Sequence, residues 1–149
     1  MIKMSFQIAA SVAVLFFSIS FAAAHCEIPC GIYDDEARMV MIAEHITTIE
    51  KSMKQIKKLQ GEKPVNDNQL IRWVMNKENH ASQLQEIVTQ YFMTQRIKPD
   101  TKQYSEKLIL LHKILIYGMK CKQTTDLSHV SAMRSLLKDF HELYFGHSN

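Results

Sequence analysis

The sequence has little glycine and little proline, with four Gly and three Pro among its 149 residues. Folds made only of β-strands need many tight turns, in which glycine and proline are among the commonest residues. Their scarcity therefore argues against an all-β fold. No internal repeat and no low-complexity segment interrupts the sequence, so we expect one small domain.

The sequence also lacks a strong excess of charge of one sign. The whole chain has 18 basic and 15 acidic residues, a formal net charge of +3. The first 24 residues hold a single charge, Lys3, so residues 25–149 keep 17 − 15 = +2. This small excess argues against binding to nucleic acid or to an anionic membrane surface.

A long apolar run occurs only at the N-terminus. It extends from Ile8 to Phe21 and is followed by Ala22-Ala23-Ala24. This pattern is typical of a cleaved export signal, and the run is short for a membrane span; an uncleaved membrane anchor is the alternative. We predict a signal peptide at residues 1–24 and a domain at residues 25–149, exported to a periplasmic, extracellular or lumenal space, with no membrane contact after cleavage.

After Tyr33, apolar residues recur at spacings of three and four in four segments, as they do on one face of an α-helix. Lys77 is the one break in the pattern. The sequence therefore predicts an all-α fold, an up-down-up-down four-helix bundle over about residues 35–146. The predicted inward-facing residues are Met39, Ile42, Ile46, Ile49, Met53 and Ile56; Leu70, Val74, Lys77, Ala81, Leu84, Val88 and Tyr91; Tyr104, Leu108, Leu111 and Leu115; and Val130, Met133, Leu137, Phe140 and Tyr144.

Capping residues and helix breakers give the expected helix boundaries. The expected starts are Asp34 or Asp35, Asn66 or Asp67, Asp100 or Thr101, and about Asp126; the expected ends are Gly61 with Pro64, Pro99, the polar break from Lys120 to Thr125, and Phe145.

The segment His25–Tyr33 has no apolar periodicity and contains two of the three cysteines, Cys26 and Cys30. Cleavage after Ala24 would give His25 a free α-amine. That amine, the Cys26 amide nitrogen and the Cys26 sulfur would close two fused five-membered chelate rings on a metal, which favours donors in one plane. Cys30 can add a fourth donor, and the His25 imidazole can approach from above this plane.

Planar nitrogen and sulfur donors favour Ni(II) or Cu(II), whereas zinc prefers a tetrahedron. Cu(II) tends to oxidise thiolates, so the donor set favours nickel. Pro29 would fix the bend of the backbone, and Gly31 would relieve crowding beyond it.

Two other interpretations of this segment stay open. One is an exported copper protein that uses His25 as an amine and imidazole ligand, although it would need a further histidine in the plane. The other is an exported, non-enzymatic metal-binding or thiol-redox protein that uses Cys26 and Cys30.

The run His25-Cys26-Glu27-Ile28-Pro29-Cys30-Gly31-Ile32-Tyr33, placed directly after a predicted cleavage site, resembles the nickel hook of nickel superoxide dismutases. Those enzymes are also four-helix bundles. The resemblance implies that superoxide is disproportionated to dioxygen and hydrogen peroxide by Ni(II)/Ni(III) cycling. It also implies one nickel ion per chain and a homohexamer.

By this resemblance His25, Cys26 and Cys30 are the metal ligands, and Tyr33 and Tyr91 are two tyrosines beside the metal. Better-known members support the axial imidazole with a carboxylate and an arginine. The sequence departs from them here, because those places hold Val40 or Met41, and His80.

Glu27 stands where those members have an aspartate. His80 is a candidate donor to the His25 imidazole, with a solvated helix histidine as an equal alternative. Cys121 is expected to be a buried or free thiol. The remaining histidines are predicted to be surface or structural residues: His45, His112, His129, His141 and His147.

Overall fold

The computed structural model describes residue 29 and residues 31–146 of the chain. The predicted signal peptide and five residues of the hook, His25, Cys26, Glu27, Ile28 and Cys30, lie outside the described residues.

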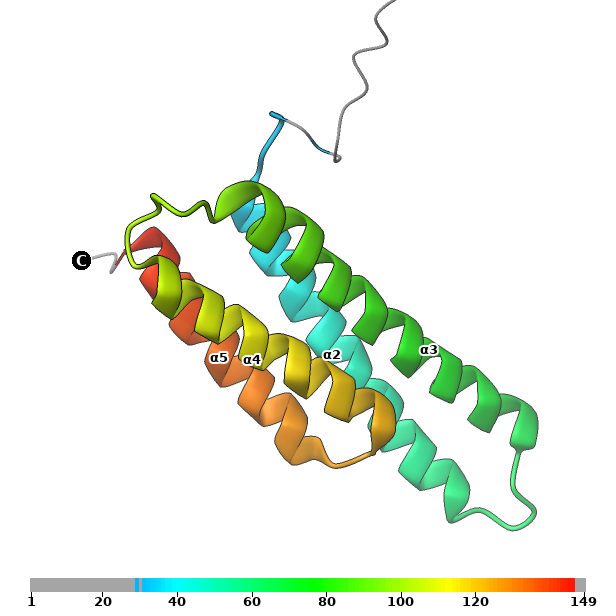
Figure 1. Cartoon of the computed structure of the whole chain (residues 1–149). Helices are drawn as coiled ribbons and strands as arrows, with labels where there is room; N and C mark the ends of the chain where they lie inside the picture. The colour runs from blue at the N-terminus through cyan, green and yellow to red at the C-terminus, as the bar shows by residue number, and fades with distance from the viewer. Residues whose placement is uncertain (1–28, 30, 147–149) are drawn as a thin grey trace, which may run out of the picture.

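The described chain is an all-helical, antiparallel four-helix bundle, as the sequence predicted (Figure 1). Its elements are α2 (Asp35–Gln60), α3 (Asp67–Glu86), the π-helix η1 (Ile87–Arg96), α4 (Tyr104–Gln123) and α5 (Leu127–Phe145). Helix α2 contacts α3 and α5, and α4 contacts the same two helices. Element η1 continues α3 as one rod, and the α2–α3 hairpin extends past the α4–α5 hairpin at its loop end.

Side chains at the predicted positions cap three of the helices. Asp34 accepts a hydrogen bond from the Ala37 amide (2.9 Å), Asn66 from the Gln69 amide (3.2 Å) and Asp126 from the Ser128 amide (2.9 Å). These caps satisfy amide groups that have no partner within the helix.

The expected start of the third helix at Asp100 or Thr101 is wrong, because α4 begins at Tyr104. The Thr101 hydroxyl instead accepts a hydrogen bond from the Lys98 amide (2.8 Å), and the Thr101 amide donates to the Lys98 carbonyl (2.8 Å). Thr101 therefore closes a turn, and Gln103 precedes the helix with a φ of 56°.

The first and fourth apolar stripes form much of the core, as predicted: all six stripe residues of α2 are buried, and so are Val130, Met133, Leu137 and Phe140 of α5. The stripe predicted for α4 is rotated. Its buried line is Lys107, Leu111, Ile114, Gly118 and Cys121, while Tyr104, Leu108 and Leu115 are partly buried beside the core. Apolar residues occupy the consecutive runs 108–111 and 114–117 of α4, so spacing alone does not decide which line faces inward.

Lys77, the break in the second stripe, is buried with 4% of its surface exposed. Its ammonium donates to the carbonyl oxygens of Cys121 (2.7 Å) and Lys122 at the C-terminal end of α4. A cation at the C-terminal end of a helix interacts favourably with the helix dipole. Val74 of the same predicted stripe is 38% exposed, so the stripe is not buried at this position.

Cys121 is a free, buried thiol, and burial raises its pKa to about 11. No helix within the described residues is long and apolar enough to cross a membrane.

Candidate functional site

A tight turn joins the hook to the bundle. The Ile32 amide donates a hydrogen bond to the Pro29 carbonyl (2.8 Å), and Gly31 has a φ of +82°. A positive φ at the third residue of a four-residue turn favours glycine. A Cβ atom at Gly31 would have no neighbour within 4 Å among the described residues, so the backbone conformation by itself accounts for this glycine, and the relief of crowding in the hook stays a prediction.

The two tyrosines predicted to act beside the metal lie together at this end of the bundle. The ring centroids of Tyr33 and Tyr91 are 5.8 Å apart with an interplanar angle of 80°, an edge-to-face contact. The guanidinium of Arg96 lies over the Tyr33 ring, with its Cζ 4.2 Å from the centroid. Tyr33 is therefore held by a ring edge and a stacked cation, while 38% of its surface stays exposed.

The carboxylate of Asp35, on the first turn of α2, accepts hydrogen bonds from three side chains. Tyr91 donates its hydroxyl to Oδ1 (2.7 Å), and Tyr144 donates its hydroxyl to Oδ2 (2.8 Å). Arg96 donates from Nε to Oδ1 and from Nη2 to Oδ2, both at 2.8 Å. Such two-pronged contacts between guanidinium and carboxylate are strong and geometrically specific. Asp35 thus joins α2, η1 and α5.

These contacts set the charges of the cluster. Burial alone would raise the pKa of Asp35, but the hydrogen bonds from Arg96, Tyr91 and Tyr144 outweigh it and lower this pKa below its usual value. Burial, together with hydrogen bonding to the charged Asp35, raises the pKa of both Tyr91 and Tyr144 to about 12. At neutral pH the cluster therefore holds one carboxylate, one guanidinium and two neutral phenols.

The π-helix explains how Tyr91 and Arg96, five residues apart, reach the same carboxylate. A π-helix closes hydrogen bonds between residues i and i+5, so such residues lie one above the other. The Ile97 amide donates to the carbonyl of Phe92, five residues earlier (2.9 Å). The side-chain hydroxyl of Thr94 likewise donates to the carbonyl of Thr89, five residues earlier (2.8 Å). In an α-helix, Tyr91 and Arg96 would point in different directions.

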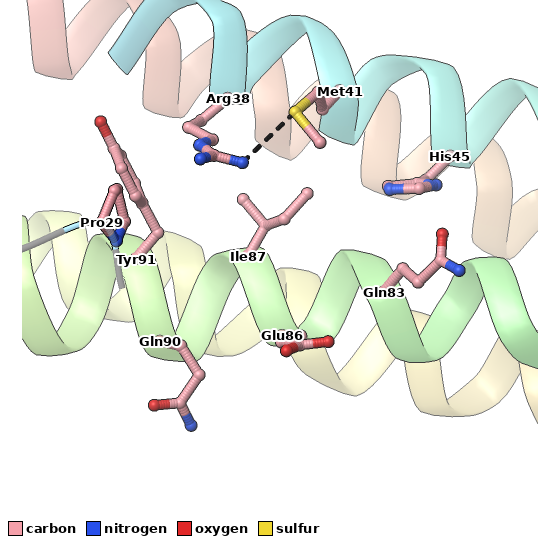
Figure 2. A pocket seen from close by; sticks show the side chains of 9 residues that line it. All are labelled: Pro29, Arg38, Met41, His45, Gln83, Glu86, Ile87, Gln90 and Tyr91. Carbon is pink, nitrogen blue, oxygen red and sulfur yellow. Dashed lines mark hydrogen bonds between the residues drawn. The ribbon is translucent and has the colours of Figure 1, made fainter. Parts of the chain in front are cut away.

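A groove of about 520 Å³ runs between α2 and the α3–η1 rod, beginning at the hook turn (Figure 2). Pro29 and Tyr91 line one end and His45 lines the other, with Arg38 between them. The lining residues are Pro29, Arg38, Met41, His45, Gln83, Glu86, Ile87, Gln90 and Tyr91.

His45 and His80 form a pair across α2 and α3. Their Nδ1 atoms are 2.8 Å apart and their ring centroids 5.1 Å apart. The two nitrogens therefore lie close to the line between the rings, as in an N–H···N hydrogen bond. Burial and the neighbouring His80 lower the pKa of His45, so this imidazole is neutral at neutral pH.

The structure thus brings Tyr33, Tyr91 and Pro29 together and pairs His80 with His45. His25, Cys26, Glu27 and Cys30 lie outside the described residues, so their assignment as ligands and supports stays a prediction. Within residues 29 and 31–146, no group of three or more His, Cys, Asp or Glu side chains could hold a metal ion.

Sequence reasoning missed Asp35 and Arg96 as residues of the site. The sequence indicates Asp35 only as a helix cap, and Arg96 follows the apolar stripe. The available signal was the position of Asp35 one turn before the buried face of α2, but its partners depend on the π-helix.

The family model described as "Nickel-containing superoxide dismutase" matches residues 20–148, well over half of the chain. No curated protein and no solved structure is detectably similar to the chain. The resemblance drawn from the hook is confirmed by the family match: the chain belongs to the nickel-containing superoxide dismutase family, and this membership implies superoxide dismutation by nickel.

Proposed function

We propose that this chain dismutates superoxide at an N-terminal hook in which His25, Cys26 and Cys30 bind one nickel ion per chain. The observation that carries the assignment is the sequence order: the two cysteines flank Pro29, which lines the groove beside Tyr91. The hook therefore leads directly into the tyrosine cluster.

The chemistry of the donors fits nickel. His25 would offer its amine and imidazole nitrogens, and Cys26 and Cys30 would offer an amide nitrogen and two thiolates, an anionic donor set that suits nickel. Bound nickel would supply the one-electron redox chemistry. Overall, two superoxide anions and two protons give one dioxygen and one hydrogen peroxide.

The chain's own residues control access and protons. Tyr33, held by Arg96 and the edge of Tyr91, limits the approach to small molecules and orders water beside the hook. Tyr91 keeps its proton at neutral pH, because its pKa is raised to about 12. It is therefore a fixed hydrogen-bond donor to Asp35, and the protons come from ordered water.

The supports of the His25 imidazole are Glu27 and the His45–His80 pair in this proposal. His45 lines the same groove as Pro29, and its bond to His80 fixes its ring. A histidine that orients another ligand through hydrogen bonds commonly tunes the metal.

Export and processing belong to the same proposal, because the His25 amine exists only after residues 1–24 are removed. The proposed assembly is a homohexamer. Exposed apolar residues near the α2–α3 loop offer a surface for contacts between chains: Val65, Ile71, Val74 and Met75.

The decisive experiment measures metal content and the electron paramagnetic resonance spectrum of correctly processed protein. We expect nickel close to one per chain and a rhombic Ni(III) signal with splitting from one axial nitrogen. Copper, or protein that is fully active without metal, would rule out the proposal.

A second experiment separates the enzyme from a metal carrier or thiol-redox protein. One extra residue before His25 removes the terminal amine donor but leaves both thiols. We expect this variant to lose dismutase activity, whereas a carrier that needs only Cys26 and Cys30 would still bind metal normally. Full activity in the extended protein would contradict the hook.

A further inference from the structure

Arg38 carries a charge in the groove, and no carboxylate of residues 29 and 31–146 forms an ion pair with it. Arg96 pairs with Asp35 and Arg134 pairs with Glu50 (2.7 Å), but none of the ion pairs formed within residues 29 and 31–146 includes Arg38. A guanidinium stays protonated at any physiological pH. The groove therefore contains a permanent cation that has no paired carboxylate in the part of the chain that the structure describes.

Weak contacts hold this guanidinium in place without using its charge. Its Cζ lies 5.1 Å from the centroid of the Tyr91 ring, within the range of a cation–π contact. One amino group donates to the Met41 sulfur (3.5 Å), a weak acceptor (Figure 2). The side chain is thus oriented, while most of its N–H groups have no hydrogen-bond partner among the described residues and can meet a ligand.

The position of Arg38 connects it to the hook. Its guanidinium lies between Pro29 and His45 along the groove, beside the same Tyr91 ring that contacts Tyr33. The other charged residue of the lining, Glu86, is exposed and in Figure 2 points away from the guanidinium. An anion in the groove would therefore meet the cation first.

We propose that Arg38 is an anion-binding residue that receives superoxide in this groove and guides it toward the hook. This inference rests on the proposed function and adds the path by which the substrate arrives. A guanidinium presents parallel N–H donors that match a diatomic or triatomic anion. A local positive charge at the mouth of a site also raises the rate of encounter with an anionic substrate.

The first test needs neither nickel nor turnover. Azide, a small linear anion, is titrated into processed, metal-free protein while the side-chain Nε–Hε signals of the arginines are followed by nuclear magnetic resonance. We expect the Arg38 signal to shift with a saturable, millimolar dependence, while the ion-paired Arg134 shows only the linear drift caused by salt. An Arg38 signal that drifts like that of Arg134 would overturn the proposal.

The second test compares Arg38→Gln, Arg38→Lys and the matched control Arg134→Gln in nickel-loaded enzyme, with kcat/KM measured by pulse radiolysis over a range of ionic strength. We expect Arg38→Gln to lower kcat/KM roughly two- to fivefold at low ionic strength and to flatten its salt dependence. Arg38→Lys should keep most of kcat/KM and most of its salt dependence. Arg134→Gln should match the unmodified enzyme in both respects.

The outcomes separate the two proposals. If the unmodified protein is inactive with nickel bound, the proposed function fails, but the azide titration still decides whether Arg38 binds anions. If the protein is active and Arg38→Gln keeps its rate, salt dependence and unshifted nickel spectrum, only the role of Arg38 fails.

Discussion

The carboxylate of Asp35, near the start of α2, accepts hydrogen bonds from Tyr91, Arg96 and Tyr144. The side chains of Asp35 and Arg96 are 15% and 29% exposed, so water screens their ion pair only in part. Tyr91 and Tyr144 would lose their acceptor if this carboxylate changed, and a buried hydroxyl without an acceptor costs stability. Asp35 therefore contributes both to folding and to the position of Tyr91.

We expect Asp35→Asn to lower the free energy of unfolding by about 2 kcal/mol, because it leaves Arg96 without its counter-charge and replaces one acceptor oxygen with a donor. Chemical denaturation measures this change. The matched control is Glu36→Gln, the next residue, whose 61% exposed side chain pairs with His141 at the surface. A loss for Asp35→Asn no larger than for Glu36→Gln would contradict this role of Asp35.

The same cluster predicts how stability depends on pH. The pKa of Asp35 is lower in the folded protein than in the unfolded chain, so its contribution is complete above about pH 5 and is lost as the pH falls through the folded value. The pKa values of Tyr91 and Tyr144 are raised to about 12. Their contribution is complete below the unfolded value of about 10 and is lost as the pH rises toward 12.

Melting temperatures measured across this pH range should therefore fall at both ends, and Asp35→Asn should weaken both dependences. In that variant we also expect tyrosine ionisation, followed by ultraviolet absorbance, to begin at lower pH, because burial would still raise both tyrosine pKa values but the charge of Asp35 would no longer add to it. Identical tyrosine titrations in the two proteins would show that Asp35 does not control them.

At the scale of the elements, the π-helix η1 brings the side chains of Tyr91 and Arg96 to the same carboxylate, that of Asp35. The apolar spacing of the sequence correctly placed Tyr91 on the buried face of the second helical segment. It could not place Arg96, because a change from the α to the π register moves every later side chain around the helix axis. That register is set by packing and by side-chain hydrogen bonds such as Thr94 to Thr89, which leave no spacing signal.

Helix α4 contains a glycine that its fold does not require. Gly118 is buried within α4, and a Cβ atom there would lie 3.5 Å from the Gln85 Cγ, an ordinary contact. We expect Gly118→Ala to raise the free energy of unfolding by about 0.5–1 kcal/mol, because alanine loses less backbone entropy in a helix. Thermal and chemical denaturation measure this gain.

Gly146, after the end of α5, is the matched opposite case. Its φ of +83° is one that L-residues rarely adopt, so Gly146→Ala should destabilise the protein, by about 1 kcal/mol. A loss of stability in Gly118→Ala comparable to that in Gly146→Ala would show that α4 and Gln85 are packed more tightly than the distances indicate.

Much of the bundle could be predicted from the sequence because burial of a helical face leaves a periodic signal. The buried stripe of α2 follows this spacing. The capping residues Asp34 and Asn66 are a separate local signal that marks where two helices begin. Two features could not be predicted, because each depends on a partner far along the chain. Lys77 is buried only because the end of α4 offers carbonyl oxygens, and His80 faces His45 from the neighbouring helix.

At the scale of the whole molecule, we expect the bundle to provide the stability of the fold and the hook to provide the metal chemistry. Among the described residues, the buried core lies between Met39 and Phe140, whereas the predicted metal ligands lie within residues 25–30. A ligand stabilises a fold only when it binds the folded state better than the unfolded chain. Ligands this close in sequence remain close in the unfolded chain, so nickel binding discriminates little between the two states.

We therefore expect removal of nickel from the processed protein by a chelator to abolish dismutase activity while its helical circular dichroism stays unchanged. The melting temperature should move by less than about 4 °C, which corresponds to roughly 1 kcal/mol for a domain of this size. The double variant Cys26→Ser/Cys30→Ser is the control, because it removes the thiolates without a chelator and should melt like the metal-free protein. A much larger loss in both proteins would mean that the hook packs against the bundle as part of its core, and the separation of stability from chemistry would be wrong.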